Sequence, residues 1–295
     1  MQKILVLSGP TGVGKTALAV KLAQKFNGEL ISADSRQIYK GMDIGTGKDT
    51  DQIWLLDVVF PDQPFSVADY QKLAHTVIKD IWKRGKLPIL VGGTGLYIKS
   101  IIDGIGTVGI PQNQKLREKL SKLSLSDLQK TLQSNNPYKW NSMNSSDQQN
   151  SRRLVRAIEI ASSKMLPAKD KRLTANSQTI HLALTAPNEI LYQRIDDRVE
   201  KRVKQGIINE IKSLLSKGYT WDLPSMSACG YRVWEDYFEK KATLAETIQK
   251  WKFEEHDYAR RQLTWFKKDK RVRWFDITKN DPFSSLVSFL SILYP

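Results

Sequence analysis

A glycine-rich string near the start of the chain constrains the fold more than any other feature of the sequence. Gly9–Thr16 has the form Gly-x-x-x-x-Gly-Lys-Thr, and it follows the short apolar run Ile4–Leu7. The segment after it, 16–26, places apolar residues at helical spacing. A loop of this kind between a strand and a helix turns its backbone N–H groups toward phosphate oxygens, and the helix N-terminus adds partial positive charge. The string therefore predicts a phosphate-binding loop next to a parallel sheet.

Every residue of this string is a candidate ligand for a diphosphate group. Lys15 supplies a positive charge, and the Thr16 hydroxyl is of the kind that coordinates Mg²⁺ in such loops. We therefore expect Mg²⁺ as a cofactor, with Thr16 as its protein ligand. The expected diphosphate-binding residues are Gly9, Pro10, Thr11, Gly12, Val13, Gly14, Lys15 and Thr16.

The first hundred residues alternate strand-like and helix-like segments, which is typical of an α/β fold with a parallel sheet covered by helices. We predict strands at 3–8, at 28–33 and from 87 into the glycines that follow, with a helix after the Ser66 cap. From 111 to 172 the strand pattern disappears, and a small all-helical insertion is expected there. The core is then 1–110 and 173–295; its second part is predicted to hold a strand at 179–186, one long basic helix at 188–218, a loop around 227–232 and a helix at 245–268.

The charge balance indicates a polyanionic partner. Lysine and arginine outnumber aspartate and glutamate by 46 to 31, which gives a formal net charge of +15. A protein this basic usually binds nucleic acid, and the alternative is a merely solubilising surface. The single cysteine, Cys229, excludes a disulfide framework, and no apolar run reaches the ~18 residues that a membrane span needs. We therefore expect a cytoplasmic protein that does not enter a membrane.

Basic and aromatic residues recur along the second half of the chain. Arg194, Arg198 and Arg202 follow one another at i, i+4 and i+8 beside an apolar stripe. Such a row usually forms a solvated flank, and the alternatives are a diphosphate clamp or one wall of an RNA groove. Near the end of the chain, basic residues alternate with aromatic ones that can stack on bases. For Trp265 and Phe266, however, core packing is the favoured interpretation.

The carboxylate best placed for chemistry is Asp34, at the end of the second predicted strand. Ligands bind at the carboxyl ends of the strands in open α/β sheets. From its spacing alone, Asp34 is equally a metal ligand, a helix cap or a general base. The third predicted strand ends in glycines, without the aspartate that a nucleoside triphosphatase uses to bind Mg²⁺. Asp57 is a weak substitute for that aspartate.

At this point the sequence resembles the tRNA dimethylallyltransferases, also called tRNA isopentenyltransferases. The motifs that carry the resemblance are "SGPTGVGKT", "LISADSRQIYKGMDIGTGK", "FSVADYQ", "PILVGGTGLY", "SRRLVRAIEI", "RIDDRV", "CGYR" and "ARRQLTWF". They follow the family's order from Ile4 to about Asp276. The phosphate-binding loop is shared with many kinases, whereas the combination with the second and fourth motifs is far more specific.

The resemblance implies a P-loop NTPase-like three-layer core whose loop holds dimethylallyl diphosphate instead of a nucleotide. The dimethylallyl group would be transferred to N6 of the adenine 3′-adjacent to the anticodon, in tRNAs that read codons beginning with U. That adenine would have to flip out of its stack to be reached. The expected partners are thus tRNA, through its anticodon stem-loop, and dimethylallyl diphosphate. The chain carries no zinc finger like that of the eukaryotic members, so the bacterial type is favoured, and we expect a monomer.

Residue roles follow from the same resemblance. Asp34 matches the family's general base, and Asp34, Thr16 and Arg198 form the implied catalytic set. Arg202 stands where the family usually has methionine, which adds charge near the expected channel. The implied tRNA contacts are Asp34, Ser35, Arg36, Gln37, Thr94, Arg117, Arg152, Arg153, Arg156, Gly230, Tyr231 and Arg232.

Three other functions remain open from the sequence. The nearest is an adenylate isopentenyltransferase that uses free AMP, ADP or ATP, which would need neither the helical insertion nor a large basic surface. The second is a P-loop small-molecule kinase that consumes ATP. The third is a nucleic-acid-binding protein whose loop only senses nucleotide, which the presence of Asp34 beside the loop disfavours.

Overall fold

The structure is a computed structural model that describes residues 2–48, 50, 52–163, 177–279 and 281–293. The chain divides into two compact units: Met1–Asp103 together with Arg172–Pro295, and Gly104–Lys171. The second unit begins before the expected boundary at 111. The reason is that the Arg156 guanidinium donates to the carbonyl groups of Thr107 and Ile110 and so ties this segment to the unit. The other expected boundary, at 172, lies outside the described residues.

The first unit contains a six-stranded sheet in which every neighbouring pair of strands is parallel, in the order β3-β2-β4-β1-β5-β6. Strand β1 pairs with β5 along its whole length, from Gln2 opposite Ser177 to Ser8 opposite Ala183. A parallel sheet whose central strands are apolar must be covered on both faces. The strands are β1 (Gln2–Ser8), β2 (Gly28–Ser32), β3 (Ile53–Trp54), β4 (Leu87–Val91), β5 (Ser177–Thr185) and β6 (Arg273–Asp276).

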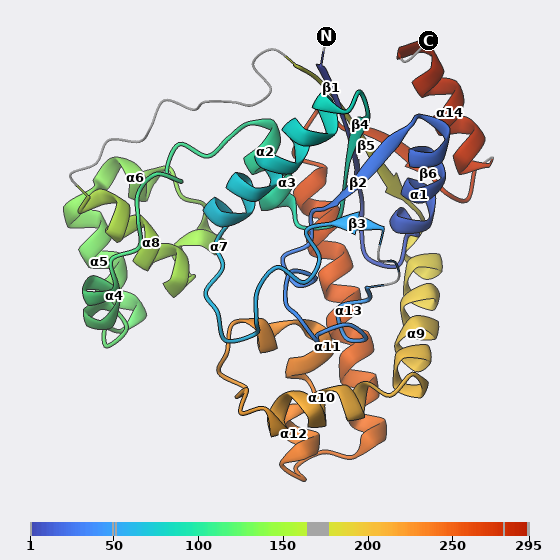
Figure 1. The fold of residues 1–295 in the computed structure, drawn as a ribbon. Helices are drawn as coiled ribbons and strands as arrows, with labels where there is room; N and C mark the ends of the chain where they lie inside the picture. The colour runs from blue at the N-terminus through green and yellow to red at the C-terminus, as the bar shows by residue number, and fades with distance from the viewer. Residues whose placement is uncertain (1, 49, 51, 164–176, 280, 294–295) are drawn as a thin grey trace. The chain divides into compact units, whose positions relative to one another are not determined.

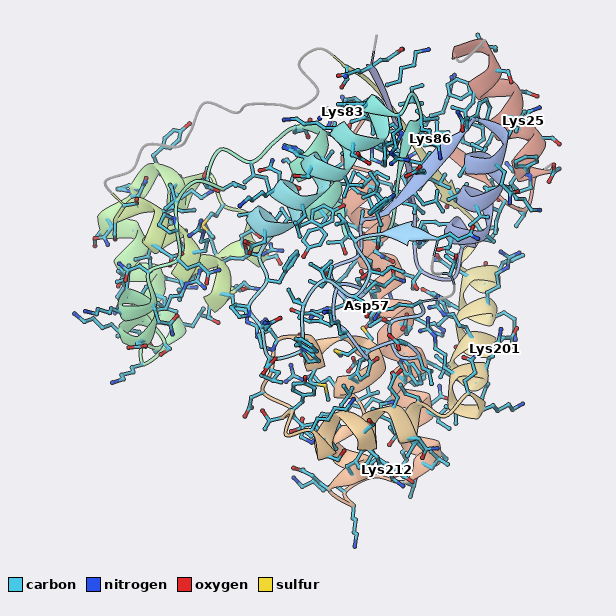
Figure 2. The ribbon with its side chains drawn as sticks, viewed as in Figure 1. Lys25, Asp57, Lys83, Lys86, Lys201 and Lys212 are labelled. Carbon is cyan, nitrogen blue, oxygen red and sulfur yellow. The ribbon has the colours of Figure 1, made fainter. Side chains whose placement is uncertain are left out.

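Helices cover the two faces of this sheet (Figure 1). On one face, leucines of β1 and β5 pack with α1 (Lys15–Lys25) and α14 (Pro282–Leu293). On the other face, the alternate β1 residues pack with α2 (Val67–Lys83) and α3 (Gly95–Ile102). Side chains fill the space between these layers (Figure 2). The arrangement confirms the expected three-layer α/β core with a parallel sheet.

The predicted helices are present, with one break. Ser66 caps α2 as expected, because its side chain accepts the Asp69 N–H while the Asp69 carboxylate accepts the Ser66 N–H. The predicted single helix at 188–218 is two helices, α9 (Asn188–Lys204) and α10 (Ile207–Ser216). They are separated at Gly206, whose φ of +98° lies outside the helical region. Apolar spacing continues on both sides of the break, so periodicity alone did not reveal it.

A second core forms where α9 and α10 pack with α13 (Leu244–Phe266). The predicted loop around 227–232 instead contains a 3-10 turn, η2 (Ser225–Ser227), and the short helix α11 (Cys229–Arg232), followed by α12 (Glu235–Phe238). Tyr231, Trp234 and Trp251 are each 0% exposed in this core. Among the helices of the described ranges, none is long and apolar enough to cross a lipid bilayer.

The regular elements of the second unit, in the part that the structure describes, are all helices. Its core is formed by leucines of α5 and α8 together with Met143. The helices are α4 (Gln114–Leu120), α5 (Leu125–Asn135), α6 (Pro137–Asn141), α7 (Ser145–Gln148) and α8 (Ser151–Ala161).

One buried carboxylate of α8 connects this helix to α4. Glu159, which is 3% exposed, accepts the Asn113 N–H at 2.6 Å and binds the Arg117 guanidinium through two hydrogen bonds of 2.9 Å. Arg156 donates to the same carboxylate. Burial by itself would raise the pKa of Glu159, but the hydrogen bonds from Arg117 and Arg156 outweigh it and hold that pKa at about 2. Both arginines therefore have a structural partner within the unit.

We predict that Glu159→Gln destabilises the second unit by about 3 kcal/mol, because it leaves two guanidinium groups partly unpaired. The folded pKa of Glu159 lies below its unfolded value, so its contribution is complete above pH ~4.3 and is lost as pH falls toward 2. Hydrogen exchange of amides in 113–163 measures this stability. The exposed neighbour Glu118→Gln is the matched control, and equal protection in both variants would contradict the prediction.

Candidate functional site

Close packing dictates glycine in the phosphate-binding loop, which connects the end of β1 to the start of α1. Gly9 has φ of +141°, and a Cβ at this position would lie 2.6 Å from the Leu184 carbonyl oxygen of β5. Gly12 has φ of +79°, and a Cβ there would lie 2.9 Å from the Ile195 side chain of α9. A strand and a helix therefore fix the course of the loop before any ligand binds.

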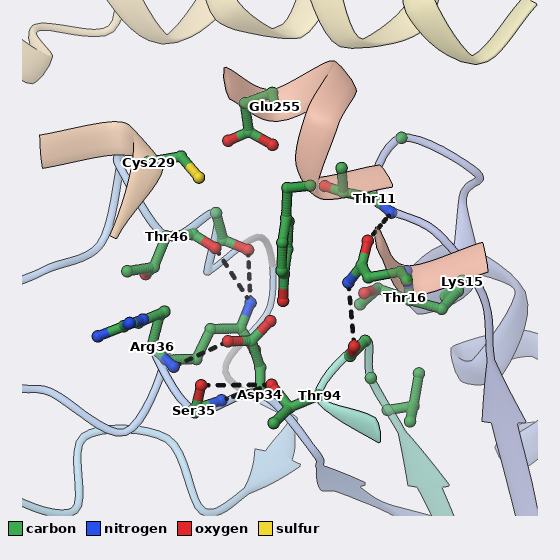
Figure 3. A pocket seen from close by; sticks show the side chains of 18 of the residues that line it. Thr11, Lys15, Thr16, Asp34, Ser35, Arg36, Thr46, Thr94, Cys229 and Glu255 are labelled. Carbon is green, nitrogen blue, oxygen red and sulfur yellow. Dashed lines mark hydrogen bonds between the residues drawn. The ribbon is translucent and has the colours of Figure 1, made fainter. Parts of the chain in front are cut away.

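The loop forms one wall of a cavity of about 920 Å³ (Figure 3). The other walls come from the segments after β2 and β4, from α9, from η2 and α11, and from α13. A cavity of this size accommodates a ligand as large as a typical drug. Of the expected site residues, those that line it are Thr11, Gly12, Gly14, Lys15, Thr16, Asp34, Ser35, Arg36, Gln37, Thr94, Arg198 and Gly230.

A glutamine of α13 joins the loop to the end of β4. The Thr11 N–H donates to Gln262 Oε1 at 2.7 Å, and Gln262 Nε2 donates to the Gly93 carbonyl oxygen at 3.1 Å. This N–H of the loop is therefore already bonded within the protein. Lys15 Nζ donates to the Pro10 carbonyl oxygen at 2.7 Å, so the lysine folds back over its own loop.

Asp34 follows β2 and begins a tight turn (Figure 3). Its Oδ1 accepts the Arg36 N–H at 2.8 Å, and the Ser35 N–H donates to Thr94 Oγ1 at 3.0 Å. These two hydrogen bonds fix the turn that carries the carboxylate to the cavity wall. Asp57, the weaker candidate, is not part of the lining, and its carboxylate binds Lys48 Nζ at 2.6 Å.

The segment 43–47 forms the wall beyond Asp34, and a second carboxylate holds it in place. Glu210 Oε2, from α10, accepts the N–H groups of Asp43 and Ile44 at 2.9 and 2.8 Å. Its Oε1 accepts the Tyr231 hydroxyl at 2.6 Å. The Gln37 side chain donates to the carbonyl oxygen of Gly47 at 2.9 Å. The wall is thus bonded to α10, to α11 and to the turn after Asp34.

The arginine row of α9 faces the cavity, contrary to the solvated flank that the sequence favoured. Arg194, Arg198 and Arg202 all line it, and Arg202 is only 6% exposed. Arg198 Nη2 donates to Thr11 Oγ1 at 2.7 Å and to Glu255 Oε2 at 3.0 Å. α13 packs along α9 and covers Arg202 and part of Arg198, a tertiary contact that periodicity does not reveal, whereas Arg194 is exposed.

Burial shifts the pKa values of two residues of the cavity lining, Lys15 and Cys229, in opposite directions. Burial, and after it the nearby Arg198, lower the pKa of Lys15 from 10.5 to about 8, against the opposing effect of Asp34 and Glu255. Lys15 therefore loses its charge at a much lower pH than an exposed lysine does. Burial raises the pKa of the Cys229 thiol to about 12, which keeps it protonated and unreactive.

Some expected site residues lie outside the cavity lining. Tyr231 is 0% exposed and donates to Glu210, so its side chain belongs to the core instead of to a ligand surface. This differs from the sequence-based expectation because the helical turn of α11 points the ring inward. Also outside the lining are Gly9, Pro10 and Val13, which are buried, and Arg232, which is exposed.

The remaining expected contacts belong to the second unit. Arg117 and Arg156 bind the buried Glu159 carboxylate described above. Arg153 forms an ion pair with Asp147, while Arg152 is exposed. Among the described residues of the unit, three of these four arginines thus have an acidic partner.

The polar face of α13 was not predicted from the sequence. Glu255, Tyr258 and Gln262 line the cavity at i, i+3 and i+7, and this helical spacing of polar residues was the available signal. Phe266 is 2% exposed, as expected, but Trp265 is 40% exposed and lines the cavity. Adjacent helix positions point about 100° apart, so one residue reaches the core while its neighbour reaches the cavity.

Comparison with protein families and curated sequences gives matches over most of the chain. A family model described as IPP transferase matches residues 37–269. A tRNA dimethylallyltransferase of Roseiflexus sp. (strain RS-1) is 41% identical over 280 residues, covering 91% of each chain. The enzyme of the same description from Anoxybacillus flavithermus is 40% identical over 299 residues, covering 97% of this chain and 94% of the relative.

Solved structures with the same fold are also found. The full-length tRNA isopentenylpyrophosphate transferase of Bacillus halodurans has a TM-score of 0.74 at 36% identity, covering 99% of this chain and 96% of its own. A eukaryotic dimethylallyltransferase, described as acting on tRNA, has a TM-score of 0.82 at 26% identity and covers 98% of this chain and 78% of its own.

We predict that the affinity of the cavity for inorganic diphosphate falls as pH rises through about 8, because Lys15 then loses its proton. Calorimetric titration between pH 6.5 and 9.5 measures the effect. Lys15→Arg is the matched control, since arginine stays protonated over this range. Parallel pH profiles for the two proteins would show that Lys15 is not responsible.

Proposed function

We propose that this chain, which belongs to the IPP transferase family, transfers a dimethylallyl group from dimethylallyl diphosphate to an adenine of tRNA. The observation that carries the proposal is the presence of a phosphate-binding loop and the Asp34 carboxylate in one cavity. The loop provides for an allylic diphosphate, and the carboxylate provides for removal of a proton from the acceptor. We assign the acceptor atom as N6 of the adenine 3′-adjacent to the anticodon, in tRNAs that read codons beginning with U.

In the proposed reaction, adenine N6 attacks C1 of the allylic chain. The N6–C1 bond forms as the C1–O bond breaks, and diphosphate leaves with that electron pair. N6 then carries one proton too many, and Asp34 accepts it. The hydrogen bonds that fix the Asp34 turn, from the Arg36 and Ser35 N–H groups, support this role because they hold the carboxylate in one place.

The leaving diphosphate would be bound by the loop together with Lys15 and Arg198. Both side chains line the cavity, and Arg198 already donates to Thr11 of the loop. Donors that are oriented in advance stabilise the charge that develops on a leaving group. Mg²⁺ fits this site, because the Thr16 hydroxyl lines the same wall and Mg²⁺ takes its other ligands from phosphate oxygens and water. Once bound, the ion would neutralise negative charge on the diphosphate.

Several features support tRNA as the acceptor. The adenine must flip out of its stack to enter the cavity, whose lining includes Arg36 and Arg261. Leu96 and Trp265, also in the lining, are 43% and 40% exposed and offer apolar surface to a base. The net charge of +15 suits phosphate contacts along an RNA stem. We propose that the second unit contacts the anticodon stem and that the enzyme acts as a monomer in the cytoplasm.

The alternatives have less support. Free AMP, ADP or ATP as acceptor would leave the net charge of +15 without a use. Phosphoryl transfer by a kinase would need a carboxylate for Mg²⁺ at the end of β4, where Gly92 and Gly93 stand. Asp57, the possible substitute, binds Lys48 outside the cavity lining.

The decisive experiment supplies labelled dimethylallyl diphosphate and Mg²⁺ with unmodified tRNA whose anticodon reads a codon beginning with U. Parallel reactions contain AMP or ATP as acceptor. We expect label in the tRNA alone, mapped to the adenine beside the anticodon. Label only in AMP or ATP would reject the proposal in favour of the free-nucleotide reaction.

We expect Asp34→Asn to lower turnover by roughly 10²- to 10⁴-fold, because asparagine cannot accept the proton. Asparagine keeps an oxygen for the Arg36 N–H, so the turn and tRNA affinity should change little. Single-turnover kinetics and tRNA binding are measured on the same preparation. The exposed Asp62→Asn serves as control, and an Asp34→Asn protein with normal turnover would exclude Asp34 as the base.

A further inference from the structure

Glu255 is the one acidic side chain besides Asp34 among the described residues that line the cavity (Figure 3). It lies on α13 and is 5% exposed. Its Oε2 accepts from Arg198 Nη2 at 3.0 Å, and its Oε1 lies 3.7 Å from Arg202 Nη1. Trp251 Nε1 also donates to Oε1, at 3.4 Å. A single buried carboxylate therefore lies between two guanidinium groups of α9.

On one side, Glu255 orients Arg198 toward the phosphate-binding loop. The same nitrogen, Nη2, donates to Glu255 and to Thr11 Oγ1, so the guanidinium bridges the carboxylate and the loop. Arg198 Nε is buried and has no hydrogen-bond partner among the described residues. The guanidinium thus has an N–H left to donate after its orientation has been fixed.

On the other side, Glu255 faces Arg202, which is 6% exposed. The Arg202 guanidinium packs so closely on Gly47 that a Cβ at Gly47 would overlap it. Gly47 has φ of +69°, and its carbonyl oxygen accepts from the Gln37 side chain. Arg202 therefore extends from α9 to the wall that follows Asp34.

The negative charge of Glu255 matters because several cationic side chains line the same cavity. Three arginines of α9 line the cavity together with Lys15, and two of them lie beside Glu255. Removing the partner of a buried charge is strongly destabilising, because the remaining charge is neither hydrated nor paired. Without Glu255, Arg198 and Arg202 would repel each other, and Arg198 would lose the contact that directs it to Thr11.

We propose that Glu255 is a positioning residue that holds Arg198 against the phosphate-binding loop and compensates the buried charge of Arg202. The diphosphate then meets a guanidinium that is already oriented. The inference rests on the proposed function in one respect, since it takes a diphosphate as the group that Arg198 receives.

Two different roles of Glu255 predict opposite effects of its removal on diphosphate binding, so the direction of the effect distinguishes them. If Glu255 only competed with diphosphate for Arg198, its removal would strengthen diphosphate binding. If Glu255 positions Arg198, its removal weakens that binding. The probe is inorganic diphosphate with Mg²⁺, titrated calorimetrically, so the readout does not require transfer to tRNA.

For Glu255→Gln we expect diphosphate affinity to fall about tenfold, the loss typical of one hydrogen bond to a charged group. The KM for dimethylallyl diphosphate should rise, while the KM for tRNA should change less than about twofold. Glu254→Gln is the matched control, since it removes the same charge from the adjacent position, which is outside the cavity lining. Unchanged or tighter diphosphate binding by Glu255→Gln would overturn the proposal.

Arg202→Met provides the second test, because methionine has a similar length without the charge. In Glu255→Gln/Arg202→Met the buried Arg202 cation is absent and no longer repels Arg198, so we expect diphosphate affinity at least about threefold higher than in Glu255→Gln alone. If the fold-change in diphosphate affinity of the double variant equalled the product of the two single fold-changes, Glu255 and Arg202 would act independently and the coupling between them would be refuted.

Thermal unfolding of each variant separates loss of binding from loss of folding. If Glu255→Gln does not fold, the double variant is compared with Arg202→Met instead, and the proposal requires weaker diphosphate binding in the double variant, by about threefold, because Arg198 has still lost its orienting contact. Equal binding by these two proteins would overturn the proposal. A wild-type protein that binds diphosphate but modifies no tRNA would reject the proposed function and leave the positioning result intact.

Discussion

The hydrogen bonds of one buried amide connect the parts of the first unit that form the cavity. Gln262 accepts the Thr11 N–H and donates to the Gly93 carbonyl oxygen, so its side chain ties the phosphate-binding loop to the end of β4. The amide is 5% exposed, and a buried amide of this kind is costly unless its hydrogen bonds are made. The position of α13 is therefore coupled to the position of the loop, although Thr11 and Gln262 are 251 positions apart along the chain.

The same helix explains glycines that a phosphate-binding role alone would not require. A Cβ at Gly93 would overlap the Gln262 side chain, and a Cβ at Gly95 would overlap the indole of Trp265. Both glycines lie in the segment after β4, where α13 passes close to the backbone. The string "GGTG" is thus in large part a packing surface for α13. Thr94, between these glycines, keeps its hydroxyl for the Ser35 N–H and so for the turn of Asp34.

What the sequence predicted well is local. The apolar strand before the Gly9–Thr16 string, the helix after it and the Ser66 capping box are each set by a few neighbouring residues, and each is present as expected. What it missed depends on contacts between distant segments. Arg198 meets Thr11 across 187 positions, and Arg117 meets Glu159 across 42, and no periodicity encodes either pair. For the same reason, the arginine row of α9 was interpreted as a flank, because the helix that covers it is specified elsewhere in the chain.

The three roles that the sequence left open for Asp34 are not exclusive, and the geometry shows why. The turn uses one oxygen, Oδ1, to accept the Arg36 N–H, which caps the backbone as an Asx turn, although no helix begins in 35–48. A carboxylate has two oxygens with about four acceptor sites, so capping does not consume its capacity to take a proton. A cap also restrains the side chain, and a restrained base loses less entropy when it meets its substrate. The hydrogen bond that appears structural is therefore a condition for the proposed chemistry.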